Sequence, residues 1–323
     1  MRARARYTGL ICFGVVLVAA ALWVVSFPMQ WWNPSARAIE TRYLRAGSRC
    51  IEVAGTRIHY QDEGRRDGLV VVLLHNDHGN LRVFDAWIPL LKERYRIVRL
   101  DLPGYGLTGE VADHDYSLEH DGRIIDELTT RLGITRFALI ATSLPASSAF
   151  RYAALHPERV TALVLANAGG LPRLPNQRLN IPDPNWLRRW AYQYYTPRSV
   201  FALGVARAFH DDALIPPGFV DQVYLFTNRK ERFRESRLRF ALYHSDDAQA
   251  VLAKVTAPVL LLWGRYSELD PSEADRFAAW LNAARSVDKI VYEDVGHALF
   301  VEAGVRAAQD VDRFVTRVTD RDQ

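Results

Sequence analysis

The chain has 323 residues, of which 49% are hydrophobic, so it can form one large domain with an insertion and is too apolar to be a disordered protein. Its formal net charge is +4, but Arg2, Arg4 and Arg6 lie in a leader, which leaves 4 − 3 = +1 for the rest and excludes a basic footprint for nucleic acid. Only Cys12 and Cys50 are present, which excludes a disulfide-stapled secreted domain.

An uncharged apolar run over residues 9–27 follows the basic leader of residues 1–8. Its length is close to what a helix needs to cross the hydrocarbon core of a bilayer. Arginines precede the run and Trp31 and Trp32 follow it, which predicts a single-pass transmembrane anchor with a cytoplasmic N-terminus and a body on the periplasmic or extracellular side. A cleaved signal peptide is the alternative, although the small-x-small site at residues 36–38 lies far beyond the run.

After a linker over residues 28–47, apolar runs alternate with amphipathic helical patterns. The runs, which are typical of strands covered on both faces, span residues 69–74, 95–100, 137–141, 160–166, 259–263 and 289–292. The helical patterns span residues 81–94, 117–132, 144–156, 272–283 and 304–318. This alternation predicts an α/β fold with a mostly parallel sheet and helices on both of its faces.

Residues 171–253 break the alternation, because no buried strand run appears among them. An insertion of this length is too long for a plain loop, and we expect a helical cap over the carboxyl edge of the sheet, where open α/β sheets bind ligands. Its helical patterns are rich in aromatic residues, namely Trp186, Trp190, Tyr192, Tyr194, Tyr195, Phe219, Tyr224 and Phe226. These favour an apolar or aromatic ligand, with the cap's own core as the alternative use of the rings.

A serine stands between the strand run that ends at Thr142 and the helical pattern over residues 144–156. A sharp strand-turn-helix arrangement of this kind exposes a hydroxyl above the carboxyl edge of a sheet, so Ser143 is a candidate nucleophile. Pro145 fits the turn less well, because its ring restricts Leu144, whose N–H is a candidate oxyanion donor. An ordinary turn with a capping serine is the alternative.

Four segments, in this order, carry a resemblance to a known family. They are VVVLLHNDHGN (residues 70–80), RIVRLDLPGYGLTG (96–109), IATSLPA (140–146) and DVGHALFVE (294–302). With them the chain resembles the α/β-hydrolase superfamily, in particular its cap-bearing esterases and carbon–carbon-bond hydrolases. The resemblance implies an α/β-hydrolase fold whose core has two parts, residues 48–170 and 254–319, separated by a cap at 171–253.

The resemblance also implies a Ser-His-acid mechanism, in which Ser143 attacks the substrate and His297 transfers the proton. The position at which the family carries the acid is Ser267 here. We therefore expect Asp270, or as a second choice Glu268, to orient the histidine, and the alternative is that no acid is present.

The loop after the first buried run departs from the family pattern, because Asn76 replaces the usual glycine. The resemblance implies that the N–H groups of Leu144 and Asp77 hold the oxyanion, but the carboxylate of Asp77 would oppose it unless it turns away or finds a partner. His75 is expected to be a supporting hydrogen-bonding residue under the site. No metal site is expected from His75, Asp77 and His78, since they are adjacent on one loop without a distant ligand cluster.

The sequence leaves three functions open. The first is a membrane-anchored serine hydrolase that cleaves an ester or related acyl substrate, small and apolar or aromatic. The second is a catalytically degenerate relative that binds a ligand or a partner protein. The third is a carbon–carbon hydrolase or lyase in which Asp77 takes part directly. No cofactor motif is present, so we expect no cofactor.

Overall fold

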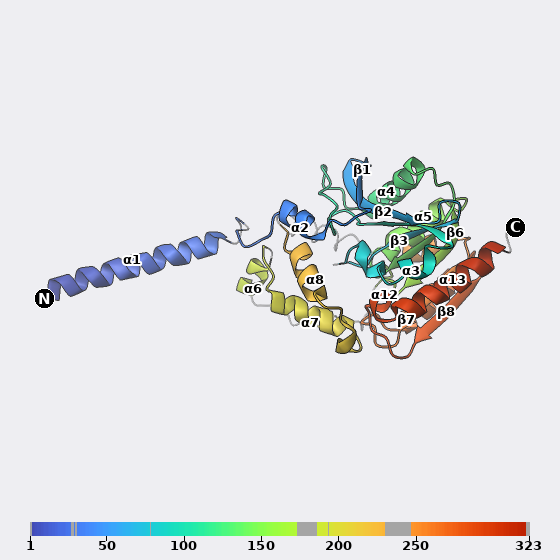
Figure 1. The fold of residues 1–323 in the computed structure, drawn as a ribbon. Coiled ribbons are helices and arrows are strands. Elements are labelled where there is room, and N and C mark those ends of the chain that lie inside the picture. Colours follow the sequence, from blue (N-terminus) through green and yellow to red (C-terminus); the bar gives the residue numbers. More distant parts are fainter. Residues whose placement is uncertain are drawn as a thin grey trace.

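The computed structural model describes residues 2–26, 29, 31–77, 79–172, 186–192, 194–229 and 247–320. Within them, an eight-stranded sheet forms the centre of the body (Figure 1), in the spatial order β1-β2-β4-β3-β5-β6-β7-β8. The strands are β1 (Arg49–Val53), β2 (Thr56–Gly64), β3 (Leu69–Leu74), β4 (Tyr95–Leu100), β5 (Phe137–Thr142), β6 (Val160–Ala166), β7 (Val259–Gly264) and β8 (Val287–Tyr292). β2 pairs antiparallel with β1 and β4, and the other pairs are parallel, which confirms the predicted mostly parallel sheet.

The apolar strand runs form the sheet because both of its faces are covered. In β3, Val72 and Leu74 pack into one core and Val71 and Leu73 into the other, since successive side chains of a strand point to opposite faces. All four are 1% exposed or less. A continuous run of apolar residues is what such a strand requires.

Helices cover both faces of the sheet, as predicted. On one face lie α4 (Leu118–Arg131), α5 (Ala146–Leu155), α10 (Ala248–Leu252) and α11 (Ser272–Trp280). On the other lie the short η1 (Leu81–Phe84), α3 (Ile88–Leu91), α12 (Leu299–Glu302) and α13 (Gly304–Asp320). The helical pattern predicted over residues 81–94 is therefore two short elements, because the chain turns after Phe84.

The N-terminal region holds α1 (Arg2–Ser26) and α2 (Ala36–Tyr43), and α1 extends away from the body (Figure 1). In the described part of the chain, no helix combines the length and the apolar character that crossing a membrane requires. This finding overturns the predicted anchor over residues 9–27 and the predicted single-pass, exported localisation.

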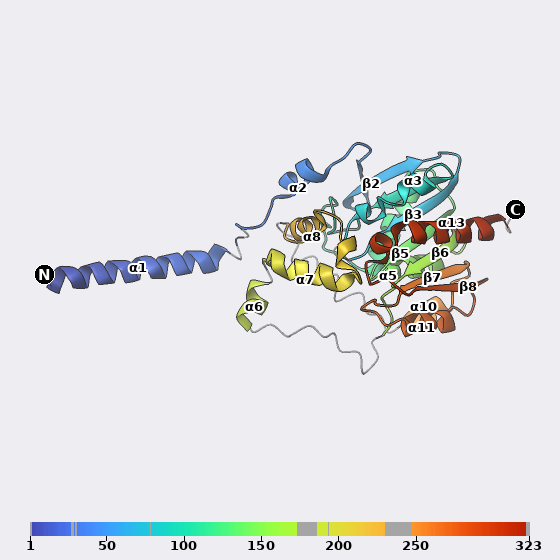
Figure 2. The ribbon, with the colours of Figure 1, turned by 60° about the horizontal axis from the view of Figure 1, so that its bottom comes forward.

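The insertion between β6 and β7 contains α6 (Trp186–Ala191), α7 (Arg198–Ala208), the short η2 (Asp212–Leu214) and α8 (Phe219–Thr227). Residues 173–185, 193 and 230–246 of the predicted cap lie outside the described residues. α7 and α8 lie side by side in both views (Figures 1 and 2).

Two contacts place these helices relative to the sheet. Arg229, just after α8, donates to the carbonyls of Gly106 and Thr108 at 3.1 and 3.0 Å, in the segment that follows β4. The N–H of Ala298, which follows β8, donates to the carbonyl of Ala208 at 2.8 Å. These contacts therefore place the C-terminal ends of α7 and α8 at the carboxyl edge of the sheet.

Candidate active site

Ser143 occupies the turn between β5 and α5. Its φ is +60°, a left-handed conformation that a residue with a side chain adopts only when its surroundings enforce it. The N–H of Ser143 donates to the carbonyl of Ala166 at 3.0 Å, and its carbonyl accepts from Gly169 N–H at 2.9 Å. Both bonds come from the end of β6 and the loop that follows it, so the neighbouring strand holds the turn in its strained conformation.

Pro145 is accommodated at the start of α5. Its φ of −58° and ψ of −14° are helical, which suits a first turn because no preceding carbonyl needs its missing N–H. The N–H of Leu144 donates to no carbonyl of the described residues. The proline thus leaves Leu144 in a position where its N–H can serve as an oxyanion donor.

The structure brings His297 to Ser143 although 154 positions separate them. Ser143 Oγ lies 3.0 Å from His297 Nε2, within the reach of a nucleophile and its base. His297 lies on the loop between β8 and α12. Parallel strands end at the same edge of the sheet, which is why the ends of β5 and β8 can present these side chains to each other.

The ring nitrogen of His297 that faces away from Ser143 meets a hydroxyl. Nδ1 lies 3.0 Å from Ser267 Oγ, and Ser267 Oγ accepts the N–H of Leu269 at 3.2 Å. Ser267 thus occupies the place at which an acid was expected, on the loop after β7. The neutral hydroxyl can fix the orientation of the imidazole, but it stabilises an imidazolium less than a carboxylate does.

Asp270 and Glu268, the predicted acids, do not contact the imidazole within the described residues. Asp270 Oδ1 instead accepts the N–H of Ser272 at 2.8 Å. Hydrogen bonds from the side chain and then the backbone of Ser272 lower the pKa of Asp270. Its carboxylate satisfies an open N–H in the first turn of α11, so the helix start after Pro271 draws it away from His297.

Asp77 lies directly at the candidate nucleophile. The hydroxyl of Ser143 donates to Asp77 Oδ1 at 2.7 Å, so the carboxylate faces the candidate nucleophile. Asn76 supports this loop, because its Nδ2 donates to the carbonyl of Asp77 at 2.9 Å. His78 lies outside the described residues.

His75 is fully buried beneath the same loop. Its Nε2 accepts the N–H of Leu102 at 3.1 Å, and its Nδ1 lies 2.7 Å from the carbonyl of Asn76. Since Nε2 accepts, Nδ1 carries the hydrogen and donates. Nε2 therefore links the loop after β3 to the segment after β4, while Nδ1 bonds within its own loop, and the supporting role of His75 stays a prediction.

Asn167 is a site residue to which the sequence assigned no role. It follows β6, is fully buried and has a φ of +40°. Its Nδ2 donates to the carbonyls of Gly296 and His297 at 3.1 and 2.9 Å, and its Oδ1 accepts Gly264 N–H at 2.9 Å. This amide therefore joins the ends of β6 and β7 to the loop of His297. The available signal was a polar residue directly after a buried apolar strand.

Glu302, in α12, connects the same loop to the insertion between β6 and β7. Its Oε1 accepts the N–H groups of His210 and Asp211, each at 2.9 Å, and its Oε2 accepts Gly296 N–H at 2.6 Å. The ring of His210 also stacks on Tyr266, with centroids 3.7 Å apart, next to Ser267 in sequence. One segment of the insertion thus contacts the loops on both sides of the imidazole, and no sequence pattern indicated this contact.

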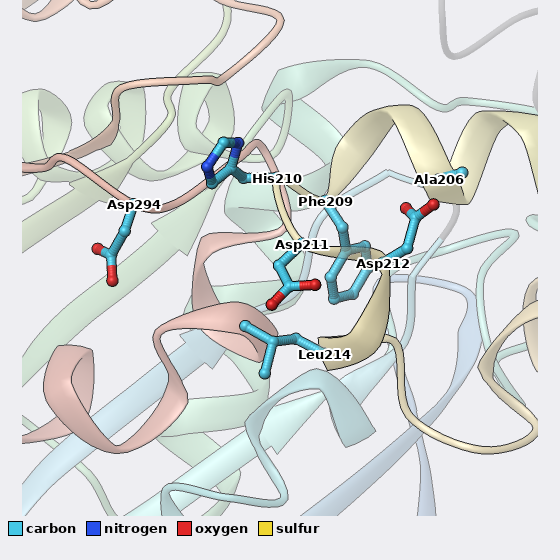
Figure 3. Close-up of a pocket in the computed structure, with 7 residues that line it drawn as sticks. All are labelled: Ala206, Phe209, His210, Asp211, Asp212, Leu214 and Asp294. Atoms are coloured by element: carbon cyan, nitrogen blue, oxygen red, sulfur yellow. The ribbon is translucent and has the colours of Figure 1, made fainter.

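An open cavity of about 560 Å³ adjoins this contact. Its walls come from the end of α7, from η2 and from the loop after β8 (Figure 3), and its lining residues are Ala206, Phe209, His210, Asp211, Asp212, Leu214 and Asp294. Neither Ser143 nor His297 lines it. Among the described residues, no three His, Cys, Asp or Glu side chains are placed to hold a metal ion. We therefore assign no metal-binding function to the acidic residues of this cavity.

Asp101 braces the loops below the site. One of its oxygens accepts Leu81 N–H at 2.7 Å, and the other accepts Leu107 N–H at 2.8 Å and lies 2.7 Å from His59 Nδ1. Burial opposes ionisation of this carboxyl, but the hydrogen bond and charge of His59 and the other donors outweigh it and lower its pKa. Gly106 is required beside it, because a Cβ there would lie 2.0 Å from Asp101 Oδ2.

Known proteins share this architecture. The family model of the alpha/beta hydrolase fold matches residues 70–304. The chain is 25% identical over 280 residues to the 2-hydroxy-6-oxononadienedioate/2-hydroxy-6-oxononatrienedioate hydrolase of Escherichia coli O81 (strain ED1a), which covers 82% of this chain and 92% of that protein.

Two solved structures have the same fold. The enol-lactonase from Burkholderia xenovorans LB400 has a TM-score of 0.69 at 20% identity and covers 83% of this chain and 100% of its own. A meta-cleavage product hydrolase from Pseudomonas fluorescens has a TM-score of 0.67 at 19% identity and covers 85% of this chain and 98% of its own. The resemblance seen in the sequence is thereby confirmed, and the chain belongs to the α/β-hydrolase fold family.

Proposed function

We propose that this protein is a serine hydrolase that cleaves a carboxylic ester or a related acyl substrate. The observation that carries the proposal is the 3.0 Å contact between Ser143 Oγ, on its strained turn, and His297 Nε2. Ser143 Oγ attacks the carbonyl carbon while His297 takes its proton, and the N–H of Leu144 donates to the oxyanion. His297 then gives the proton to the leaving alkoxide, and water releases the acyl group by the same steps.

Ser267 takes the orienting role in this mechanism. A hydrogen bond from a neutral hydroxyl fixes the ring of His297 but adds no negative charge opposite the imidazolium that forms during attack. The proposed enzyme is therefore slower than one with a carboxylate at this place. The hydroxyl of Ser267 in place of a carboxylate is also the reason to consider the alternative, in which the protein is catalytically degenerate and only binds a ligand or a partner.

Aromatic residues of the insertion support the proposed substrate class. Tyr195 and Phe201 each pack against Tyr224, at ring-centroid distances of 6.4 and 6.1 Å, and all three are half-buried. Such surfaces favour contact with apolar or aromatic groups. A small acyl ester with an apolar or aromatic part is accordingly the substrate to test first.

The test is the turnover of short aryl and acyl esters by Ser143→Ala. The proposal expects hydrolysis to fall to background, while the matched control Ser199→Ala, in an exposed position of α7, keeps the wild-type rate. Unchanged turnover by Ser143→Ala would refute the proposal, provided that both variants melt like the wild type.

A carbon–carbon hydrolase or lyase that uses Asp77 is the second candidate. The contact of Asp77 Oδ1 with Ser143 Oγ at 2.7 Å favours it, because the carboxylate can act as an acid or base on a bound substrate. The Escherichia coli relative is named as a hydrolase of 2-hydroxy-6-oxononadienedioate, which is the first such substrate to try. Asp77→Asn should abolish this turnover in a folded protein, and a wild-type rate would dispose of the candidate.

A further inference from the structure

A second pair of serine and histidine lies outside the candidate active site. Ser48 Oγ, on the loop between α2 and β1, lies 2.9 Å from His59 Nε2, and His59 Nδ1 lies 2.7 Å from Asp101 Oδ2. The order of the groups is hydroxyl, imidazole and carboxylate, which is the order that activates a serine for attack on a carbonyl carbon. At the candidate active site, by contrast, a hydroxyl backs the imidazole.

The hydrogen bonds around Asp101 set the direction of this second relay. Its carboxylate accepts the N–H groups of Leu81 at 2.7 Å and of Leu107 at 2.8 Å, and two such donors favour the ionised form. An ionised carboxylate can only accept, so His59 Nδ1 carries the hydrogen and donates it. In a neutral imidazole the other nitrogen is then an acceptor, so His59 Nε2 can take the hydrogen of Ser48 Oγ.

Ser48 is more accessible than the two residues behind it. His59 and Asp101 are 3% and 1% exposed, whereas Ser48 is half-buried. A turn holds Ser48 in place, because its N–H donates to the carbonyl of Arg45 at 3.1 Å and its Oγ accepts the N–H of Arg45 at 3.4 Å. The hydroxyl is therefore fixed against the imidazole while the residue can still be reached from solvent.

A small cavity of about 10 Å³ adjoins this relay. It has room for about one water molecule, so only the smallest acyl groups can be accommodated beside the hydroxyl, and the bulkier phosphorus centre of a fluorophosphonate cannot. The residues that line it include Ser48, His59, Asp101, Arg45 and Arg82. Both arginines also pair with Asp85, but a guanidinium has further N–H groups that can donate to an oxyanion formed at Ser48.

We propose that Ser48, His59 and Asp101 form a second acyl-accepting site, which takes a small acyl group from an activated ester and holds it as an ester of Ser48. This site does not depend on the proposed serine hydrolase site. Ser48 Oγ bonds to the carbonyl carbon, the bond from that carbon to the leaving oxygen breaks, and the Ser48 hydrogen passes through His59 Nε2 to the leaving oxygen. Asp101 fixes the tautomer of His59 and gains no proton.

The acyl group should stay on Ser48 and not be hydrolysed. Release needs a water molecule that reaches both the acyl carbon and His59 Nε2. His59 is buried, and the small cavity beside it cannot hold an acyl group and a water molecule together. Ser48 is therefore a modification site and not a second site of turnover.

The experiment treats Ser143→Ala with p-nitrophenyl acetate and locates the acetyl groups by mass spectrometry of the digested protein. We expect a burst of about one p-nitrophenolate per chain, an acetyl group on Ser48 and no steady turnover. A general base contributes about 10²- to 10⁴-fold in rate. Ser48 should therefore be acetylated at least about 100-fold faster than the matched control Ser199, an exposed serine of α7.

Two variants test the relay itself. Adding Ser48→Ala to Ser143→Ala should remove the burst, whereas Ser48→Ala alone should keep the steady ester turnover of the wild type. Asp101→Asn should slow the acetylation of Ser48, because an amide can donate to His59 Nδ1 and leave the hydrogen on Nε2. If this variant does not fold, the ratio of the Ser48 and Ser199 rates in the parent protein decides.

Acetylation of Ser48 that is no faster than that of Ser199 would overturn the inference, and so would a full rate in folded Asp101→Asn. Either result leaves the proposed serine hydrolase untouched. Steady turnover by Ser143→Ala at the wild-type rate would instead refute the proposed function, whatever happens at Ser48.

Discussion

A carboxylate at position 267 should accelerate the proposed reaction. Ser267 Oγ lies 3.0 Å from His297 Nδ1 and accepts Leu269 N–H at 3.2 Å, so Ser267→Asp places an anion beside the ring with one donor already in place. A neutral hydrogen bond contributes about 0.5 to 1.5 kcal/mol and one to a charged group about 1.5 to 3 kcal/mol. Because Ser267 is half-buried, we take a gain of about 1 to 2 kcal/mol in transition-state stabilisation, or about 5- to 30-fold in rate.

The assay is kcat/KM for ester hydrolysis, together with the second-order rate constant for labelling by a fluorophosphonate. Ser267→Asp should raise both, and Ser267→Ala should lower both by about 2- to 12-fold, because one neutral hydrogen bond is lost. Asp270→Asn should leave both unchanged. If Ser267→Asp and Ser267→Ala both behave like the wild type, Ser267 does not orient His297 and the reasoning fails.

Three further predictions concern the frame of the site. Glu302→Gln removes one acceptor oxygen from the contact that joins His210, Asp211 and Gly296. As a result, kcat should fall about 10-fold with little change in KM. The control Glu293→Gln, at an exposed position, should keep the wild-type kcat. Asp101→Asn should lower the free energy of unfolding in urea by about 3 to 5 kcal/mol, because the buried partners of Asp101 lose the negative charge that they bind. A loss below about 1 kcal/mol would contradict the bracing role. The folded pKa of Asp101 lies below its ordinary value of 3.8, so its stabilisation is fully present above that value and is lost as the pH falls through the folded pKa; the stability difference between wild type and Asp101→Asn should shrink in acid, and a growing difference would reverse the sign.

Local sequence patterns were sufficient for the sheet and for Ser143. The run in β3 could be assigned because a strand covered on both faces needs apolar residues at every position. Ser143 could be found because it stands directly after a strand, whereas His297, on the loop that follows β8, was found through the family resemblance. Family resemblance supplied their roles, and the structure supplied the distance between them.

The partner of His297 could not be predicted, because the choice depends on where α11 starts. Asp270 and Ser267 lie on the same loop, and only the folded backbone decides that Asp270 caps the helix while Ser267 reaches the imidazole. The role of Asn167 could not be predicted for the same reason, since its partners come from two distant segments of the chain. The contacts of Glu302 are likewise between elements far apart in sequence, which no local pattern encodes.

Two other expectations concerned the N-terminal apolar run and Asp77. The apolar run over residues 9–27 suggested a membrane span by its composition, but in the described residues no helix meets the requirement. Asp77 was expected either to contribute its N–H to the oxyanion or to take part directly in a carbon–carbon hydrolase or lyase. The structure adds that its carboxylate accepts the Ser143 hydroxyl at 2.7 Å.

The central claim is that Ser143 is the nucleophile and His297 its base, and covalent labelling tests it most directly. After treatment with a fluorophosphonate, mass spectrometry of the digested protein should find the added mass on the peptide that contains Ser143. The label should disappear in Ser143→Ala and fall strongly in His297→Ala. A folded wild-type protein that takes no label, or that carries it on another serine, would contradict the account.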